Sequence, residues 1–515
     1  MRCIHEISHL TSHIVVAIFV CGACVCVAFA VIFCQALRCV IQFTLFFAKP
    51  LQAHAVPLFS SCLDLFARLV PLYIDTVVNN AHTSTSQPDG DEGGVETLVL
   101  QLYEVLLCLA QSRRFKDGLR PVVHTLCECS LRYMQIGARQ QEEWEDDPSQ
   151  FIEDDESIAE GSGLCVRSSA AALLHELLDN FGNESLAIFL TCIRKQMAEA
   201  RTAKASGNDN WWKLRETCLF ALCYHKKYVK RSSARAASAQ DDADGHLSVE
   251  ALVITVLNED IFPTDVPVFL RGRALRLGVD FARQIKGTEQ SSSFLRAAVA
   301  GMHAEDMSPL RATSCVCIGR MCAVLAREET KPFAPTMFRE LMRFLQDADE
   351  DLIHVALECL SLVVKVDTAV STAAVVEIGP AVMQGWSNFF NDPLISATVL
   401  EVFEAFASIP ECQTSLHAFL MPAISGVLRD PNAQGTIVDG ILDLIVTLLK
   451  DCNEELTQTA FVTIFAQLIE MVRNRDIVCD VCNSHAQKHM QLYMHARVCN
   501  AHVSRRAYRA NDTDK

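Results

Sequence analysis

The sequence predicts an all-α protein built as a solenoid of stacked antiparallel helix pairs. Apolar residues recur at three- and four-residue spacing through most of the chain, which is the pattern of a helix with one buried stripe. Short polar or proline-containing joints break the pattern often, and sustained two-residue alternation with hairpin turns is missing from the sequence. A helix pair between two such joints cannot bury both of its faces alone, so neighbouring pairs must stack.

The clearest single helix is expected at residues 95–111, where Leu98, Leu102, Val105, Leu106 and Leu109 fall on one stripe. The same spacing recurs at residues 352–366, 395–409, 435–451 and 457–472.

The joints of the second half are rich in aspartate, which caps the following helix and ends the preceding one. They lie near Asp306, Asp347, Asp392, Asp430 and Asp451. Intervals of roughly 20 to 45 residues hold one or two helices each, which is the spacing of a paired-helix solenoid.

The chain divides into an apolar segment at 1–50, the solenoid at 51–474 and a polar tail rich in Cys and His at 475–515. Ile14 to Cys34 is a run of 21 uncharged residues, long enough to cross a bilayer. Three interpretations stay open: a membrane anchor for a helical-repeat scaffold or adaptor, a helix buried against the next repeat, or an amino terminus not native to the rest.

Two polar segments inside the solenoid are expected to be loops: an acidic loop at 142–163 and a polar insert at 225–245 that changes from basic to acidic.

Composition limits the function. Half of the residues are hydrophobic, which suffices for a large core, and 21% are charged. The net charge of −17 repels nucleic acid and favours basic partners, so we expect no direct nucleic-acid binding. The 23 cysteines stand singly in apolar stretches, which indicates reduced thiols of a cytosolic or nuclear protein rather than a disulfide framework.

No enzyme and no cofactor are expected, because the Gly-rich phosphate loop, the H-E-x-x-H motif and the G-x-S-x-G elbow are all missing from the sequence. One spacing in the tail resembles a metal site: Cys479, Cys482, His495 and Cys499 could surround a tetrahedral zinc ion. Ala486 stands near where such a finger needs a large aromatic residue, and chance matches are frequent in a tail of this composition. We therefore predict no metal ligand.

The acidic stretch is the candidate site. Nine of the sixteen residues from 142 to 157 are acidic and none is basic. We expect the charge to hold the segment extended, with Pro148 preventing a helix, while two aromatic residues pack back onto the helical wall. The candidate residues are Glu142, Glu143, Trp144, Glu145, Asp146, Asp147, Phe151, Glu153, Asp154, Asp155 and Glu156. An acidic arm of this kind complements Lys- and Arg-rich surfaces, although a solvated loop without a partner explains the charge too.

The same stretch carries a family resemblance. Its W-x-x-D-P-x-x-F pattern, from Trp144 to Phe151, resembles a segment of the importin-beta (karyopherin) superfamily, most closely of its importin-nine type. The similarity extends over about residues 98–472, through motifs that include VRSSAAALLHELL, NDNWWKLRETCLFAL, FLRGRALRLGVDFA and NDPLISATVLEVFEAFASIPECQ.

The resemblance implies a right-handed HEAT-repeat (armadillo-like) superhelical solenoid that carries protein cargo into the nucleus. Members bind cargo on the concave face and release it with the small GTPase Ran, and the importin-nine type is associated with histones, actin and ribosomal proteins. An acidic loop of a middle repeat contacts Ran or basic cargo in relatives. A receptor of this kind is found in cytoplasm and nucleus.

This sequence departs from the family pattern at both ends. The amino-terminal repeats that carry the main Ran-binding surface would lie before residue 51, and the carboxy-terminal half of a full receptor is missing. The sequence is therefore expected to be a middle section, which weakens the expectation of Ran binding and of full cargo wrapping.

Overall fold

The computed structural model describes residues 22–47, 49, 55–80, 94–160, 165–238, 247–303, 309–389, 392–430, 435–450 and 454–474. Nearly all of these lie in helices, and no strand occurs among them, as the apolar spacing predicts. The chain forms two compact units, Met1–Asp367 (unit 1) and Thr368–Lys515 (unit 2), and each is a stack of helices.

The helices of unit 1 form two rows, and the chain alternates between them, as stacked antiparallel pairs require. The first row comprises α4 (Ala55–Tyr73), α7 (Val123–Tyr133), α11 (Asn183–Ala205), α14 (Val249–Val256) with η6 (Leu257–Ile261), α17 (Glu289–Gly301) and α20 (Ala334–Asp347). The second row comprises α5 (Val95–Gln111), α10 (Val166–Phe181), α12 (Trp211–Tyr224), α15 (Val268–Asp280), α18 (Pro309–Val324) and α21 (Glu350–Val363).

Four further helices of unit 1 lie outside this alternation: α2 (Gly22–Phe46), α8 (Ala138–Asp146), α9 (Pro148–Glu160) and α13 (Lys226–Ser238). Short elements complete the connections: η2 (Ile74–Val78), η4 (Arg113–Phe115), α6 (Lys116–Leu119), η5 (Arg120–Val122), α16 (Ala282–Ile285), α19 (Arg327–Thr330) and η7 (Lys331–Phe333).

The core lies between the rows. The predicted stripe of α5 is buried in full, since Leu98, Leu102, Val105, Leu106 and Leu109 are each at most 2% exposed. Burial of such a side chain stabilises the fold by about 1.5–3 kcal/mol.

Buried arginines near the starts of two second-row helices connect their helix pair to the next pair. Arg215 of α12 forms a two-nitrogen ion pair with Asp260 of η6, at 3.0 Å (Nε–Oδ1) and 2.9 Å (Nη2–Oδ2). Arg311 of α18 reaches Asp347 of α20 at 2.9 Å. Both arginines are 1% exposed. Because a buried charge without a partner costs several kcal/mol, these pairs fix the register between neighbouring repeats.

Unit 2 repeats the two-row order with α22 (Thr368–Phe389), α24 (Pro410–Arg429) and α26 (Glu454–Asn474) in one row and α23 (Pro393–Ala407) and α25 (Gly435–Lys450) in the other. Asp392 caps α23, because its carboxylate accepts the backbone N–H groups of Leu394 and Ile395 at 2.7 and 3.0 Å. The predicted capping role of aspartate is confirmed at this joint.

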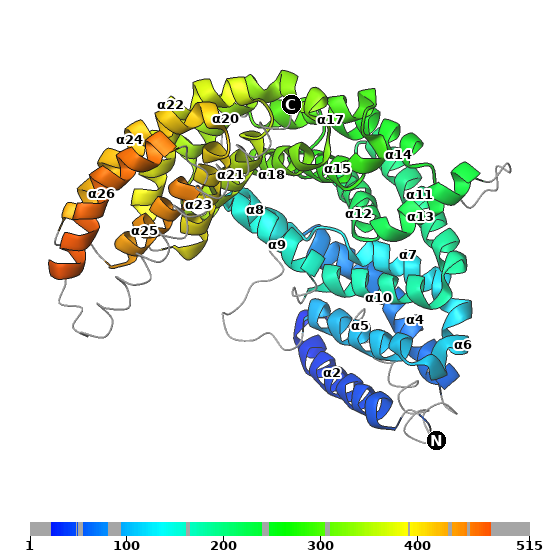
Figure 1. Cartoon of the computed structure of the whole chain (residues 1–515). Helices are drawn as coiled ribbons and strands as arrows, with labels where there is room; N and C mark the ends of the chain where they lie inside the picture. Colours follow the sequence, from blue (N-terminus) through cyan, green and yellow to red (C-terminus); the bar gives the residue numbers. More distant parts are fainter. Residues whose placement is uncertain are drawn as a thin grey trace, which may run out of the picture. The chain divides into compact units, whose positions relative to one another are not determined.

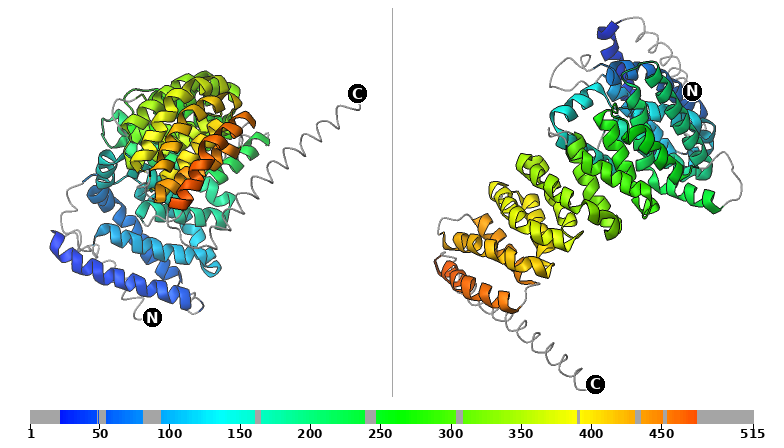
Figure 2. Two further views of the ribbon diagram at one scale, coloured as in Figure 1. Left: turned by 60° about the vertical axis from the view of Figure 1, so that its left-hand side comes forward. Right: turned by 90° about the horizontal axis from the view of Figure 1, so that it is seen from above.

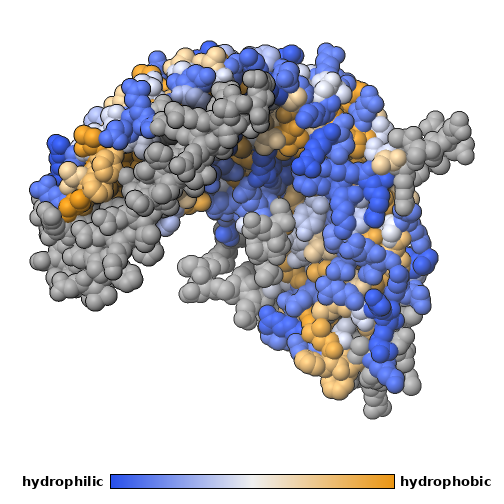
Figure 3. Space-filling view, in the orientation of Figure 1, coloured by the Kyte–Doolittle hydropathy of each residue, from blue (hydrophilic) through white to orange (hydrophobic). Residues whose placement is uncertain are grey.

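The amino-terminal helix α2 packs on α5, and its Leu37 and Ile41 are buried. Its end leaves several large apolar side chains exposed, and Figure 3 shows apolar side chains gathered over this end of unit 1. They are Phe43, Leu45, Phe46 and Phe47.

Of the apolar run 14–34, residues 14–21 lie outside the described residues. Within the described ranges, no single helix has both the length and the apolar composition to span a membrane. The consecutive helical segments 95–111 and 113–133, which are bent at the break between them, reach that length and composition only when they are taken as one.

The predicted polar insert at 225–245 is wrong in its first part, which is helix α13; residues 239–245 lie outside the description. Tyr228 and Val229 are buried and seat the helix, and the Tyr228 hydroxyl donates to Asp179 of α10. Lys226 pairs with Asp280 of α15. Two apolar anchors are thus enough to dock a strongly basic helix when carboxylates lie beside it.

The cysteines whose side chains the structure describes are free thiols, and most of them are buried in the core.

His225, between α12 and α13, gives the fold an acid sensitivity. It is 1% exposed, and neither ring nitrogen has a hydrogen-bond partner. Burial, with a smaller contribution from His175, lowers the pKa of His225 to about 3. The unfolded chain binds this proton near pH 6.5 and the folded chain does not, so stability falls as the pH drops from about 6.5 toward 3.

We predict that His225→Gln removes the part of the acid-induced loss of stability that is due to His225. Urea unfolding at pH 6.5 and 5.0 should show a loss of stability in the original chain that is larger, by about 1–2 kcal/mol, than the loss in the variant. Equal losses in the two proteins would contradict a buried neutral His225.

Candidate functional site: the acidic helices α8 and α9

The acidic segment is inserted between α7 and α10, the two helices of one repeat. The predicted acidic loop at 142–163 is wrong, because α8 and α9 are helical up to residue 160; residues 161–163 lie outside the description. Pro148 is the first residue of α9, a position where its missing N–H and fixed φ favour a helix. Asp147 caps that helix by accepting the backbone N–H of Ser149 at 3.0 Å.

Local pairing reduces the repulsion within these helices. Arg139 reaches Glu143 at 2.7 Å, and Gln141 donates to Glu145 at 2.9 Å, both across one helical turn. Charge that was expected to keep the chain extended is therefore accommodated on helix surfaces.

The aromatic residues anchor the insert, as predicted. Trp144 and Phe151 are 2% and 3% exposed, and their ring centroids lie 4.8 Å apart. Both rings contact Phe269 of α15, at 5.7 and 5.6 Å, and Trp212 of α12 stacks on the same phenylalanine at 5.9 Å. The Trp144 indole N–H donates to Asp154 at 2.8 Å. The cluster fixes α8 against α9 and both helices against the second row.

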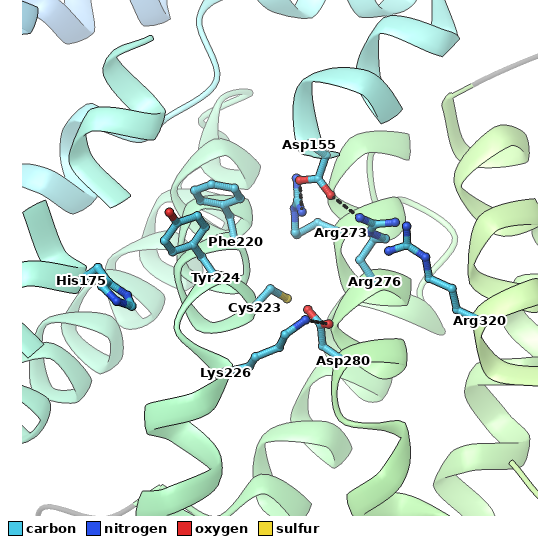
Figure 4. Close-up of a pocket in the computed structure, with 10 residues that line it drawn as sticks. All are labelled: Asp155, His175, Phe220, Cys223, Tyr224, Lys226, Arg273, Arg276, Asp280 and Arg320. Atoms are coloured by element: carbon cyan, nitrogen blue, oxygen red, sulfur yellow. Dashed lines mark hydrogen bonds and ion pairs between the residues drawn. The ribbon is translucent and has the colours of Figure 1, made fainter. Parts of the chain in front are cut away.

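Asp155 of α9 lies between two arginines of α15 (Figure 4). Arg273 Nη1 approaches its Oδ1 at 2.6 Å, and Arg276 Nη2 approaches its Oδ2 at 2.8 Å. Burial by itself raises the pKa of Asp155, but the two arginines outweigh it and hold that pKa at about 2. Asp155 is therefore ionised at neutral pH.

The network continues below the insert. Arg273 donates to Glu216 of α12 at 2.9 Å, and Arg167 of α10 reaches the same carboxylate at 2.6 Å. Glu156 of α9 pairs with Arg320 of α18 at 2.6 Å. The insert thus lies along the second row, with two ion pairs to α15 and one to α18.

The structure separates the candidate residues into two sets. Trp144, Phe151, Asp154, Asp155 and Glu156 have partners inside unit 1. The exposed set is Glu142, Glu143, Glu145, Asp146, Asp147 and Glu153.

An outward acidic row remains on α8. Glu142, Glu145 and Asp146 are spaced by three and four residues and lie on one face of the helix. No ion pair joins these three residues, or Glu153, to another residue in the described part of the chain. This acidic row, Glu142, Glu145 and Asp146, is the charge that remains available to a partner.

The basic side of the network was not predicted. Arg273, Arg276 and Arg320 neutralise α9, and none of the three belongs to the apolar–Arg pattern that recurs at the starts of second-row helices. It reads VRSSA at 166–170, LRETC at 214–218 and LRATS at 310–314. What the pattern does not reveal is which carboxylate each arginine meets.

The predicted zinc spacing Cys479, Cys482, His495 and Cys499 lies outside the described residues. Within them, no group of three or more His, Cys, Asp or Glu side chains could hold a metal ion.

We predict that Asp155→Asn destabilises unit 1 by about 3 kcal/mol, because Arg276 loses its one described carboxylate partner and Arg273 keeps only Glu216. Asn keeps the size of the side chain, so packing is unchanged. Glu153→Gln on the exposed face of the same helix should change stability by no more than about 0.5 kcal/mol. Urea unfolding followed by circular dichroism measures both, and equal effects would contradict the assigned role of Asp155.

The pKa of Asp155 is lower in the folded chain than in the unfolded chain. Ionised Asp155 therefore adds to the free energy of unfolding above about pH 4, and this contribution is lost as the pH falls toward 2. The difference between the original chain and Asp155→Asn should shrink over that interval.

Comparison with known proteins finds similarity to Importin-9 in sequence and to Lph2 and Kap95p in fold. No family model matches the chain. Importin-9 of Drosophila melanogaster is 22% identical over 429 residues, which cover 80% of this chain and 40% of that protein.

Two solved structures share the fold. Lph2, described as a novel bidirectional nuclear transport receptor in S. cerevisiae, has a TM-score of 0.57 at 13% identity over 88% of this chain and 50% of its own. Kap95p, described as inducing the switch loops of RanGDP to adopt the GTP-bound conformation, has a TM-score of 0.54 at 15% identity over 84% of this chain and 49% of its own.

These likenesses confirm the HEAT-repeat solenoid fold, and the relatives are transport receptors rather than enzymes. The chain spans 40% of the length of Importin-9 of Drosophila melanogaster. The resemblance read from the motifs is confirmed as a similarity: the chain is similar to Importin-9 over 80% of its length and shares the fold of Lph2 and Kap95p.

Proposed function

We propose that this chain acts as a nuclear transport receptor that binds basic protein cargo and moves between cytoplasm and nucleus. The observation that carries the proposal is the similarity to Importin-9 across 80% of the chain. The fold shared with Lph2 and Kap95p supports it, as does the net charge of −17, which favours basic partners.

The cargo contact that we propose is the acidic row of α8. Because Trp144 and Asp154 fix α8 against α9, the three carboxylates are held at set positions on a rigid helix. Charge placed this way steers a Lys- or Arg-rich partner and loses little conformational entropy on binding. Histones and ribosomal proteins are the cargo class that fits, since their surfaces are strongly basic.

Release by Ran belongs to the same proposal. Its support is the fold shared with Kap95p, whose description includes binding to RanGDP. If release works in this way, RanGTP added to a cargo complex should free the cargo, and a complex unaffected by RanGTP would separate cargo binding from Ran switching.

The test of cargo binding is neutralisation of the acidic row. The variant Glu142→Gln, Glu145→Gln, Asp146→Asn should bind a core histone dimer about tenfold more weakly at low salt, because it removes three attractive charges. The difference in histone affinity between the original chain and the variant should become smaller as the salt concentration rises, because salt screens the attraction between charges. Fluorescence anisotropy with a labelled histone dimer measures both.

A matched control carries the same change of charge elsewhere in unit 1. Glu250, Glu289 and Glu328 are exposed and lie at the starts of three other helices. Their substitution by glutamine should leave the affinity within about twofold of the original. An equal loss in both triple variants would mean that net charge alone, and not α8, attracts the cargo.

A further inference from the structure

A cavity of about 340 Å³ opens in unit 1 beside α9, among α10, α12, α15 and α18. Figure 4 shows its charged side chains around one space. Four of them are cationic and two are carboxylates: Lys226, Arg273, Arg276, Arg320, Asp155 and Asp280. Cations outnumber carboxylates among the lining residues, and two carboxylates outside the lining, Glu216 and Glu156, pair with Arg273 and Arg320.

Two of these cations retain unused donors. Arg276 pairs with Asp155, and Arg320 pairs with Glu156; the structure describes no other ion pair or hydrogen bond for either arginine. A guanidinium group has five N–H donors. Most of the donors of Arg276 and Arg320 thus remain for a ligand that enters the cavity.

The other two cations, Arg273 and Lys226, differ in how exposed they are and in how many partners they already have. Arg273 is 3% exposed and already contacts Glu216 and Asp155, so it supplies fixed positive charge rather than a free donor. The Lys226 side chain is 47% exposed and pairs with Asp280 at the edge of the cavity. Its ammonium group can turn toward an anion without moving the backbone.

The ligand chemistry follows from this arrangement. A compact anion can accept the N–H donors of Arg276 and Arg320 that Asp155 and Glu156 leave unused. Planar guanidinium groups match the oxygen geometry of phosphate. The cavity is too small for a folded protein domain but accommodates a phosphate or pyrophosphate group.

We propose that this cavity binds a phosphate group, with Arg276 and Arg320 as its direct contacts and Lys226 at its entrance. The site is separate from the acidic row of α8, and it would give a cargo receptor a second ligand of opposite charge. The phosphate can come from a small molecule or from a phosphorylated side chain, and the chemistry in the cavity is the same.

The test is titration calorimetry of the full chain with two probes, inorganic pyrophosphate and a short phosphoserine peptide. Saturable binding of either probe at one site supports the proposal and identifies the source of the phosphate. Arg320→Gln should weaken that binding about tenfold, because a charge-assisted contact is lost. Lys226→Gln should weaken it by a smaller factor.

The matched control is Arg120→Gln. Arg120 is an exposed arginine with one carboxylate partner, Glu184 at 2.8 Å, and it lies outside the cavity. Its substitution should leave binding unchanged, and circular dichroism should show that all variants keep their helix content. Failure of both probes to saturate, or an equal loss in Arg120→Gln and Arg320→Gln, overturns the proposal and leaves cargo binding by α8 untouched.

Discussion

The buried ion pairs between Asp155 and the two arginines Arg273 and Arg276 are the interaction on which the functional region depends. Removing one member of such a buried ion pair costs several kcal/mol, because its partner is left as an uncompensated charge in the interior. This contact fixes α9 on α15. The hydrogen bond from Trp144 to Asp154 then transmits the same placement to α8.

As a consequence, the carboxylates of the insert form two groups, one paired inside unit 1 and one exposed. Carboxylates of α9 that face the second row neutralise arginines of that row and stabilise the stack, while those of α8 that face outward keep their charge for solvent and partners. The charge written in the sequence therefore overstates the charge available to a cargo. The same pairing leaves Arg276 and Arg320 facing a cavity with donors to spare, so one contact shapes both an acidic and a basic surface.

Periodicity was sufficient to predict the helices, because the stripe of Leu98 to Leu109 depends only on local spacing. The aromatic anchors Trp144 and Phe151 were predicted from their residue type within an acidic run. The helical state of the acidic segment could not be read in the same way. An Asp-Pro joint can end one helix and begin another, and the arginines that stabilise α9 lie more than 100 residues further along the chain. Only the fold brings Asp155 and Arg273 together.

Hydrogen–deuterium exchange measured by mass spectrometry at neutral pH tests the central claim most directly. If buried ion pairs hold the acidic segment in place, the backbone amides of α9 should exchange as slowly as those of α10, which the same network joins to it. Exchange across residues 148–160 at the rate of an unstructured peptide, with α10 still protected, would contradict a fixed helix and return the segment to a mobile acidic arm.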